Sequence, residues 1–433
     1  MRINDLRLRF CKLGQKFADL YATTGSFPRA TYYLIKFVAL RAGAVAWVAL
    51  GSFRLRQRRA EIVRRRDEPG EPPLIAIKLT GGLGDYILAA RYLRDLAASV
   101  EPFRFDAYCN NPDMAQWIFG CVPGFRAAYS EFVFEELKKT YPLALWITNF
   151  VVVHHENVDW SVIRERRKLC AALQNAIRFR PKIAPLIDAH PYMDGYLAQK
   201  AVYMNLRRWN FVHGMTKIPY GGNEFEIAVS DAALARYALQ AGCYVTIHNG
   251  FDPMFVITAR TATKCYPRFE TVVKHIKSRL PRLPIVQLGT RTSQPIAGVD
   301  LNLVDKLTIR EAAGVLKHSR FHIDIESGLV HLASCFSVRS CVVFGPTPVD
   351  YFAYPMNINL RPVECGGCWW INQTWMDQCP RGLPEPVCMT SHDPERLAAT
   401  IIEALRSARP KLVAEAQPPQ WSGLEDAALS RIT

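Results

Sequence analysis

The feature that most constrains the fold is a series of short apolar segments that end in glycine or polar residues and are separated by stretches with helical spacing. The first, residues 74–79 (LIAIKL), follows a proline-rich linker. Such alternation is typical of parallel strands joined by helices in α/β proteins. The strands it predicts are residues 74–79, 103–108, 143–153, 243–248, 283–288, 321–325 and 340–344. They fall into two groups, so the sequence predicts two α/β halves.

The length of 433 residues also exceeds what one compact core usually accommodates. Between the two groups, residues 230–240 (SDAALARYALQ) predict a helix capped by Ser230, which puts the boundary near residue 228. A terminal helix is expected from Asp393, where Asp-Pro marks a helix start. The predicted division is a basic helical region with its linker at 1–72, a first α/β domain at 73–228, a second at 229–407 and a tail at 408–433.

Basic residues are concentrated near the N-terminus. The chain carries 54 Lys or Arg against 39 Asp or Glu, a net charge of +15, and residues 1–71 hold 15 basic against 6 acidic residues. An anionic partner is therefore expected. Apolar residues at helical spacing in 32–46, followed by an arginine-rich run, leave two interpretations open. One is a helical layer packed on the body or on a second copy in a homo-oligomer, and the other is peripheral docking on an anionic membrane.

No nucleic-acid-binding motif is present, so no nucleic acid partner is expected. Residues 1–16 lack the apolar core of a secretory signal, and Lys36 and Arg41 interrupt the best apolar stretch before it attains the roughly 20 residues of a membrane span. We therefore expect a cytoplasmic protein, peripheral to the inner membrane if the basic region docks there. A hydrophobic content of 49% with 21% charged residues is typical of a globular chain.

A glycine-rich turn, residues 80–85 (TGGLGD), follows the first predicted strand. Gly82 and Gly84 allow another molecule to approach the backbone, and Asp85 falls near a helix N-terminus, where the helix dipole favours an ionised carboxylate. This pattern predicts a carboxylate in a ligand cleft, with a helix-capping role as the alternative. A dinucleotide fingerprint is disfavoured because Ile87 stands where its third glycine belongs, which argues against a dehydrogenase.

Polar residues also follow two predicted strands of the second half. At 321–333 (FHIDIESGLVHLA) a buried strand meets a helix, and at 248–250 (HNG) another strand ends before a helix start at 260–267 (RTATKCYP). Amides, hydroxyls and cationic groups at the carboxyl ends of strands can bind the phosphates and sugar of a nucleotide. The candidate binding residues are Asn249, Thr263, Lys264, Glu326, Ser327, Gly328, Leu329 and His331.

Four motifs in this order resemble glycosyltransferase family 9, the ADP-heptose heptosyltransferases, over about residues 73–407. They are G-x-L-G-D, the Lys-x-aromatic-Pro helix start, the acidic-Ser-Gly-x-x-His-Leu-Ala turn and F-G-P-T-P. The resemblance implies the GT-B architecture, in which two Rossmann-like domains face a central cleft. The first domain would bind the acceptor and the second the nucleotide-sugar donor. The implied chemistry is inverting transfer without a catalytic metal.

The resemblance also implies roles for residues at matching positions. Asp85 would be the base that removes the acceptor proton, in a loop containing Gly82 and Gly84, and Lys264 would pair with the donor diphosphate. The other donor-binding residues would be Asn249, Thr263, Glu326, Ser327, Gly328, Leu329 and His331. Two departures concern donor identity: Glu326 replaces the usual Asp, and Phe251 replaces a small or hydroxyl residue.

Four of the twelve cysteines lie within residues 364–390, as Cys365-x-x-Cys368, Cys379 and Cys388. Four thiolates so spaced can enclose one structural ion, and both zinc and iron accept such ligands, so the metal stays open, as does a set of independent reduced thiols. We expect a metal-binding knob at this segment. The cluster resembles that of bacterial protein heptosyltransferases, which carry iron there and form large oligomers.

The function predicted from the sequence is an inverting glycosyltransferase. It would move a heptose or related sugar from an ADP-type donor to a hydroxyl of a lipopolysaccharide or surface-glycan precursor, or of a protein. The basic N-terminal region favours the first acceptor and the cysteine segment the second. The alternative is a non-catalytic GT-B-like module for sugar binding or metal-stapled assembly.

Overall fold

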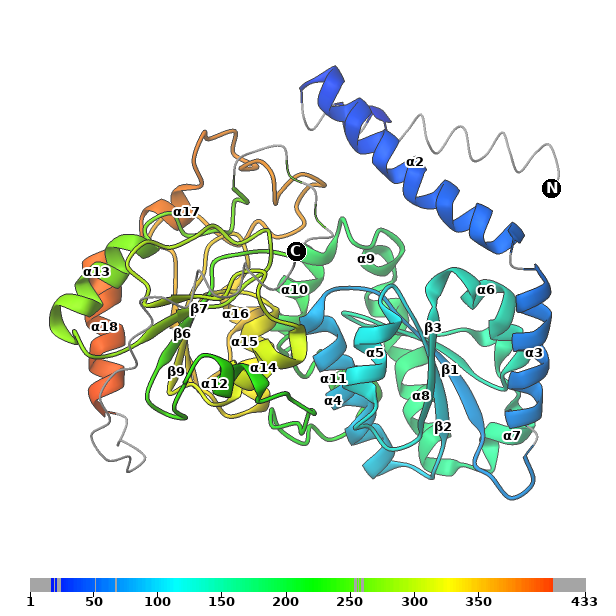
Figure 1. Ribbon diagram of the computed structural model, residues 1–433. Coiled ribbons are helices and arrows are strands. Elements are labelled where there is room, and N and C mark those ends of the chain that lie inside the picture. Colours follow the sequence, from blue (N-terminus) through cyan, green and yellow to red (C-terminus); the bar gives the residue numbers. More distant parts are fainter. Residues whose placement is uncertain are drawn as a thin grey trace.

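The computed structural model describes residues 17–18, 20–21, 25–50, 52–66, 68–252, 255, 257 and 261–407, with the backbone alone at 37, 40–50 and 52–56. Residues 1–16, which were searched for a signal, and the predicted tail at 408–433 lie outside this set. Figure 1 shows two α/β bodies side by side, with the N-terminal helices along one edge.

The first body contains a five-stranded sheet in the order β3-β2-β1-β4-β5, parallel except for β5. The strands are β1 (Leu74–Leu79), β2 (Arg104–Cys109), β3 (Phe125–Ser130), β4 (Ala144–Ile147) and β5 (Val151–Val153). The single strand predicted at 143–153 is wrong, because Thr148 donates to the Phe150 carbonyl at 2.9 Å and folds the segment into two antiparallel strands. Strand β3 was not predicted, because its FRAAYS sequence lacks β-branched residues.

The second body contains a six-stranded parallel sheet in the order β11-β10-β9-β6-β7-β8. The strands are β6 (Val245–Ile247), β7 (Ile285–Gln287), β8 (Leu301–Asn302), β9 (Phe321–Ile325), β10 (Ser340–Val343) and β11 (Ile358–Leu360). The short edge strands β8 and β11 were not predicted. In both sheets the strand order reverses beside the first strand, between β1 and β4 and between β6 and β9, which is where ligands bind in such folds.

Helices cover both sheets (Figure 1). Their bounds are α2 (Phe27–Leu50), α3 (Ser52–Arg66), α4 (Leu83–Ser99), α5 (Pro112–Phe119), α6 (Phe134–Leu137), α7 (Trp160–Arg164), α8 (Arg167–Phe179), α9 (Ala184–Asp188), α10 (Asp194–Tyr203), α11 (Phe211–Thr216), α12 (Ala232–Arg236), α13 (Phe269–Arg279), α14 (Ile309–Lys317), α15 (Gly328–Cys335), α16 (Val349–Phe352), α17 (Val387–Thr390) and α18 (Pro394–Ser407).

Two predicted helix starts have different outcomes. Asp393 accepts from the amides of Glu395 and Arg396 at 2.8 and 3.0 Å, which confirms it as the residue that starts α18. Ser230 does not cap α12, because Asp231 is the N-cap residue and the Ser230 amide instead donates to the Arg310 carbonyl at 3.0 Å. The segment near the predicted boundary is thereby tied to the second body.

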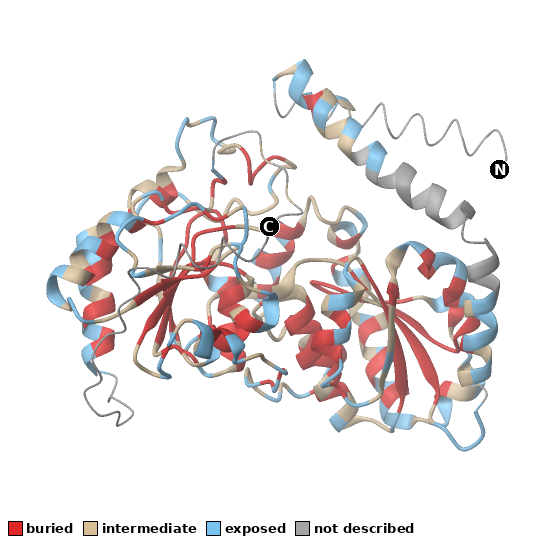
Figure 2. Ribbon diagram, viewed as in Figure 1, coloured by how far each residue is buried: buried red, intermediate tan, exposed pale blue. Residues whose placement is uncertain are grey.

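The two bodies share continuous buried cores. Helix α4 of the first packs against α15 of the second, so that Leu93 and Leu332 belong to one apolar cluster. A second cluster joins the helical segment 183–216 to the second sheet through Phe211, Phe344 and Tyr351. Figure 2 shows buried residues running through the junction between the bodies. The cleft between the halves is therefore a cavity within a packed interface.

The N-terminal helices touch both bodies. Helix α3 buries Ile62 and pairs Arg65 with the buried Asp106 at 3.3 Å in the first body. In α2 the Tyr33 hydroxyl donates to Asp377 in the cysteine segment of the second. None of the helices in the described part of the chain combines the length and apolar character that crossing a bilayer requires.

Candidate active site

A cavity of about 380 Å³ lies between the two bodies. The glycine turn before α4 contributes one side of it, and the ends of β6 and β9 with the residues that follow them contribute the other. Its lining includes most of the residues singled out from the sequence, namely Gly82, Gly84, Asp85, Lys264, Glu326, Ser327, Gly328, Leu329 and His331. Parallel strands bring these distant segments together because their carboxyl ends meet at one edge of each sheet.

Asp85 occupies the first turn of α4 and has both carboxylate oxygens engaged. Oδ2 accepts from the Gly82 amide at 2.9 Å, and Oδ1 accepts from the guanidinium of Arg208. Gly81 has a φ of 144°, and a Cβ there would lie 2.2 Å from Asp85 Oδ2, so the turn requires glycine. Asp85 thus caps the helix and also lines the cavity, which reconciles the two interpretations of the motif.

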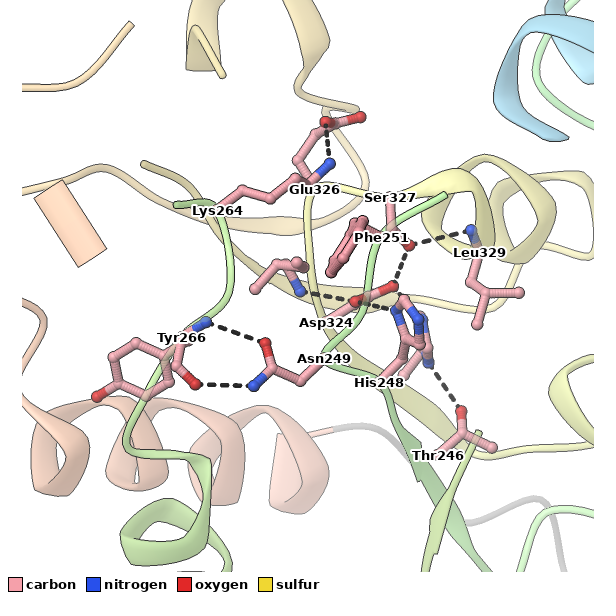
Figure 3. A network of polar contacts seen from close by, with 12 residues as sticks. Thr246, His248, Asn249, Phe251, Lys264, Tyr266, Asp324, Glu326, Ser327 and Leu329 are labelled. Atoms are coloured by element: carbon pink, nitrogen blue, oxygen red, sulfur yellow. Dashed lines mark hydrogen bonds and ion pairs between the residues drawn. The ribbon is translucent and has the colours of Figure 1, made fainter. Parts of the chain in front are cut away.

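Ser327 is the N-cap of α15. Its Oγ accepts from the Leu329 amide at 3.1 Å and donates to Asp324 Oδ2 at 2.5 Å. The buried Asp324 also accepts from His248 Nδ1 at 2.8 Å and His322 Nε2 at 3.0 Å, as part of the network in Figure 3. Burial acts to raise the pKa of Asp324, but the two histidines outweigh it and lower the pKa to about 2. An ionised carboxylate beneath the cavity therefore holds Ser327 and His248 in place.

Lys264, Glu326 and His331 form a polar cluster at the cavity. Glu326 lies between Lys264 Nζ at 3.4 Å and His331 Nε2 at 3.6 Å, and His331 Nδ1 lies 2.7 Å from the Tyr354 hydroxyl, which accepts from Arg91 at 2.8 Å. Burial opposes both charges, yet Lys264 and His331 lower the pKa of Glu326, and Tyr354 and Glu326 raise that of His331. The cluster places a lysine and a histidine on either side of one carboxylate.

The side chains of Asn249 and Thr263, predicted to bind a donor, do not line this cavity. The Asn249 amide group bonds the Tyr266 backbone at both ends, at 2.8 and 2.9 Å (Figure 3). Thr263 Oγ1 donates to the Trp375 carbonyl at 2.6 Å. Both side chains hold the loop that carries Lys264, so they shape the site through the backbone.

Several lining residues were not predicted from the sequence. Trp369, Trp370 and Trp375 come from the cysteine segment, which was expected to form a separate knob. Instead the segment packs against the second body, where the Trp369 amide donates to the Pro346 carbonyl at 2.9 Å. Arg208 is also unforeseen, because no motif surrounds it. For the cysteine segment, the tryptophans interleaved with the cysteines were a sequence signal that it could pack against the body and line the cavity.

The four cysteines of the segment line one small cavity of about 20 Å³. All four are free, and burial, reinforced by the neighbouring thiols, raises the pKa of Cys368 to about 11 and of Cys388 to about 12. Within the described ranges, no three His, Cys, Asp or Glu side chains are arranged so that they could hold a metal ion. The predicted metal site is therefore not confirmed.

No protein-family model matches the sequence, and no curated protein matches it. Among solved structures, the chain is similar to TibC, a dodecameric iron-containing heptosyltransferase of enterotoxigenic E. coli, in complex with ADP-D-beta-D-heptose. The identity is 14% over 79% of this chain and 80% of that chain, with a TM-score of 0.50. It is also similar to E. coli ADP-heptose lps heptosyltransferase II. The identity is 13% over 77% of this chain and 99% of that chain, with a TM-score of 0.44. A third similar structure is a glycosyl transferase of family 9 from Veillonella parvula. The identity is 12% over 78% of this chain and 98% of that chain, with a TM-score of 0.42.

The comparison with TibC supports the class of fold. The chain is an α/β protein with two sheets of mainly parallel strands, the architecture of its glycosyltransferase neighbours. Among the particular glycosyltransferases that it resembles is the heptosyltransferase TibC.

Proposed function

We propose that the chain is an inverting glycosyltransferase of family 9. It would transfer a heptose or related sugar from an ADP-type nucleotide-sugar to a hydroxyl of a surface-glycan precursor or of a protein. One observation carries the proposal: Asp85 of the first body lines the same cavity as Lys264 and the Ser327 turn of the second. A base and a cationic diphosphate site on opposite sides of one cavity are what displacement at an anomeric carbon requires.

In the proposed reaction the acceptor oxygen forms a bond to the anomeric carbon while the bond to the donor diphosphate breaks. Asp85 takes the proton of the acceptor hydroxyl. Lys264 and the first amides of α15, at Gly328 and Leu329, would stabilise the charge that develops on the departing nucleoside diphosphate. Displacement from the face opposite the leaving group inverts the anomeric configuration. The base, the lysine and the two amides that act in this reaction all belong to the chain itself.

The decisive experiment compares Asp85→Asn with the wild type and with Asp113→Asn, an exposed control on α5. We expect Asp85→Asn to abolish transfer while the donor still raises the melting temperature, because the amide cannot take a proton. Transfer that survives in Asp85→Asn would refute the base assignment.

A panel of ADP-heptose and UDP-, GDP- and dTDP-sugars, scored by the rise in melting temperature, identifies the donor. A wild-type protein that binds donor without transferring sugar would favour the non-catalytic module.

The cysteine segment supports a proposal of its own. Cys365, Cys368, Cys379 and Cys388 line one cavity as free thiols, and a cation there would offset the cost of ionising buried sulfur. No three of these thiols are arranged to ligate an ion in the structure, so we propose that binding one structural iron or zinc ion would draw the four together. Elemental analysis of the purified protein should give about one ion per chain. Cys388→Ser should lose the ion, whereas Cys121→Ser, at an exposed cysteine, should keep it.

The N-terminal region supports a proposal about partners and location. Helix α2 exposes Phe27, Tyr32, Ile35 and Val38, and α3 follows with its basic residues. We propose that this surface contacts either an anionic inner-membrane surface from the cytoplasm or a second copy of the chain. The TibC neighbour is dodecameric, which supports the second partner.

A further inference from the structure

Arg208 is a buried arginine to which neither the motifs nor the resemblance assigns a role. It lies between α10 and α11, is 4% exposed and lines the cavity beside Asp85. A buried guanidinium is costly unless carboxylates and hydrogen bonds compensate its charge. Its partners therefore indicate why it is there.

The main partner is Asp85. The Arg208 guanidinium donates to Oδ1, while Oδ2 is held by the Gly82 amide at 2.9 Å. Two donors on the two oxygens fix the rotation of the carboxylate about its χ angles. Each oxygen keeps a second lone pair, so the carboxylate can still accept a proton.

The charge of Arg208 is balanced from a second side. Burial acts to lower its pKa, but Asp85, Tyr351 and Asp194 outweigh burial and raise the pKa, so the guanidinium is cationic. Asp194 is itself buried and held by Asn149 at 2.5 Å and His190 at 2.8 Å. Asp194 therefore adds to the environment that keeps Arg208 charged.

The backbone of Arg208 connects the base to the other body. Its amide donates to the carbonyl of Tyr351, in α16 of the second body, at 2.8 Å. The side chain thus holds Asp85 of the first body while the main chain is attached to the second. The orientation of the carboxylate depends in this way on how the two bodies are packed.

We propose that Arg208 is a positioning residue that orients Asp85 for proton removal and couples that orientation to the packing of the two bodies. This inference rests on the proposed function. Arg208 acts through Asp85, so its loss should lower kcat while donor binding, which belongs to the Lys264 side of the cavity, is unchanged. A purely structural arginine would lower both together.

The test measures kcat, the KM values and the donor dissociation constant for Arg208→Gln, Arg208→Lys and the control Arg207→Gln. For Arg208→Gln we expect kcat to fall about 10- to 100-fold, the size of effect that a misplaced catalytic group produces, with the donor dissociation constant within about twofold of the wild type. Arg208→Lys keeps the charge and one donor group, and should recover part of kcat. Arg207→Gln should behave as the wild type.

A wild-type kcat in Arg208→Gln, or equal losses of kcat and donor affinity, would overturn the inference. If Arg208→Gln does not fold, Arg208→Lys decides alone, and equal losses of kcat and donor affinity in that variant overturn the proposal. Failure of the proposed function looks different, because then the wild type transfers no sugar, or Asp85→Asn remains active, whatever Arg208 does.

Discussion

At the scale of single residues, Asp324 shows how the second body supports its site. The carboxylate is buried and accepts from His248, His322, the Ser327 hydroxyl and the Ile325 amide, the last at 2.7 Å. Four donors satisfy it fully, so the charge is stable without solvent. The network keeps His248 and Ser327 at the cavity in one arrangement.

Replacing this carboxylate should be costly. Asp324→Asn turns one acceptor into an NH₂ group that faces donors, and we expect it to destabilise the fold by about 3 kcal/mol, as for other broken buried charge networks. Chemical denaturation measures the loss. Asp305→Asn, at an exposed position of positive φ that Asn tolerates, is the control. Equal unfolding free energies for the two variants would contradict the prediction.

The same residue predicts a dependence of stability on pH. The pKa of Asp324 is lowered from 3.8 to about 2, so the unfolded chain binds more protons in this range. Its contribution is complete above pH 3.8 and is lost as the pH falls toward 2. Unfolding midpoints of the wild type should therefore decline between these values, and those of Asp324→Asn should decline less. If the midpoints of the two proteins fell in parallel with pH, other carboxylates would dominate the pH dependence of stability.

At the scale of elements, the contact of α4 with α15 brings the two sides of the cavity together. A Cβ at Gly84 would lie 2.5 Å from His331 Cδ2, and one at Gly328 would lie 2.9 Å from Leu83 Cβ. The glycines let the helix starts approach until Asp85 and the Ser327 turn share a cavity. Glycine is required at both positions because any side chain would collide with the facing helix.

Filling this contact should separate the elements. Gly84→Ala should displace His331 from Glu326 or push the helices apart, at a cost of about 1–3 kcal/mol, as for other overpacked cores. We expect lower melting temperature and weaker donor binding, measured by calorimetry. Ala98→Ser, on the exposed side of α4, is the matched control. Wild-type donor affinity in Gly84→Ala would show that the contact is loose enough to adapt.

At the scale of the whole molecule, the apolar surface of α2 is unusual for an exposed helix. Phe27 is 64% and Ile35 62% exposed, whereas Ala30 is buried and the Tyr33 hydroxyl donates to Asp377 of the second body. Exposed apolar residues beside a basic helix are typical of surfaces that meet anionic membranes or partner subunits.

The two partners give different results with one variant. If the partner is a membrane, the full-length protein should sediment with vesicles that contain anionic lipid, and Ile35→Glu should reduce that binding without changing its mass in solution. If the partner is a second copy, Ile35→Glu should dissociate an oligomer seen by analytical ultracentrifugation. Arg59→Gln, on the exposed surface of α3, tests the contribution of charge. A monomer without vesicle binding would exclude both partners.

The sequence by itself determined the two series of strands and the polar residues at their carboxyl ends. Periodicity, glycine turns and helix starts are local signals, and parallel sheets align strand ends, so the lining residues Asp85, Lys264 and Ser327 follow from local pattern. The short edge strands did not follow, because two or three residues carry too little periodicity.

Only the tertiary structure decided which side chains face the cavity. Asn249 and Thr263 have the right chemistry in the right loops, but backbone groups engage their side chains: those of Tyr266, 17 residues away, and of Trp375, 112 residues away. Arg208 stands in no motif, yet folding places it between Asp85 and Tyr351. Most buried polar groups find hydrogen-bond partners, and for Thr263 and Arg208 packing supplies those partners from segments more than a hundred residues away in the sequence.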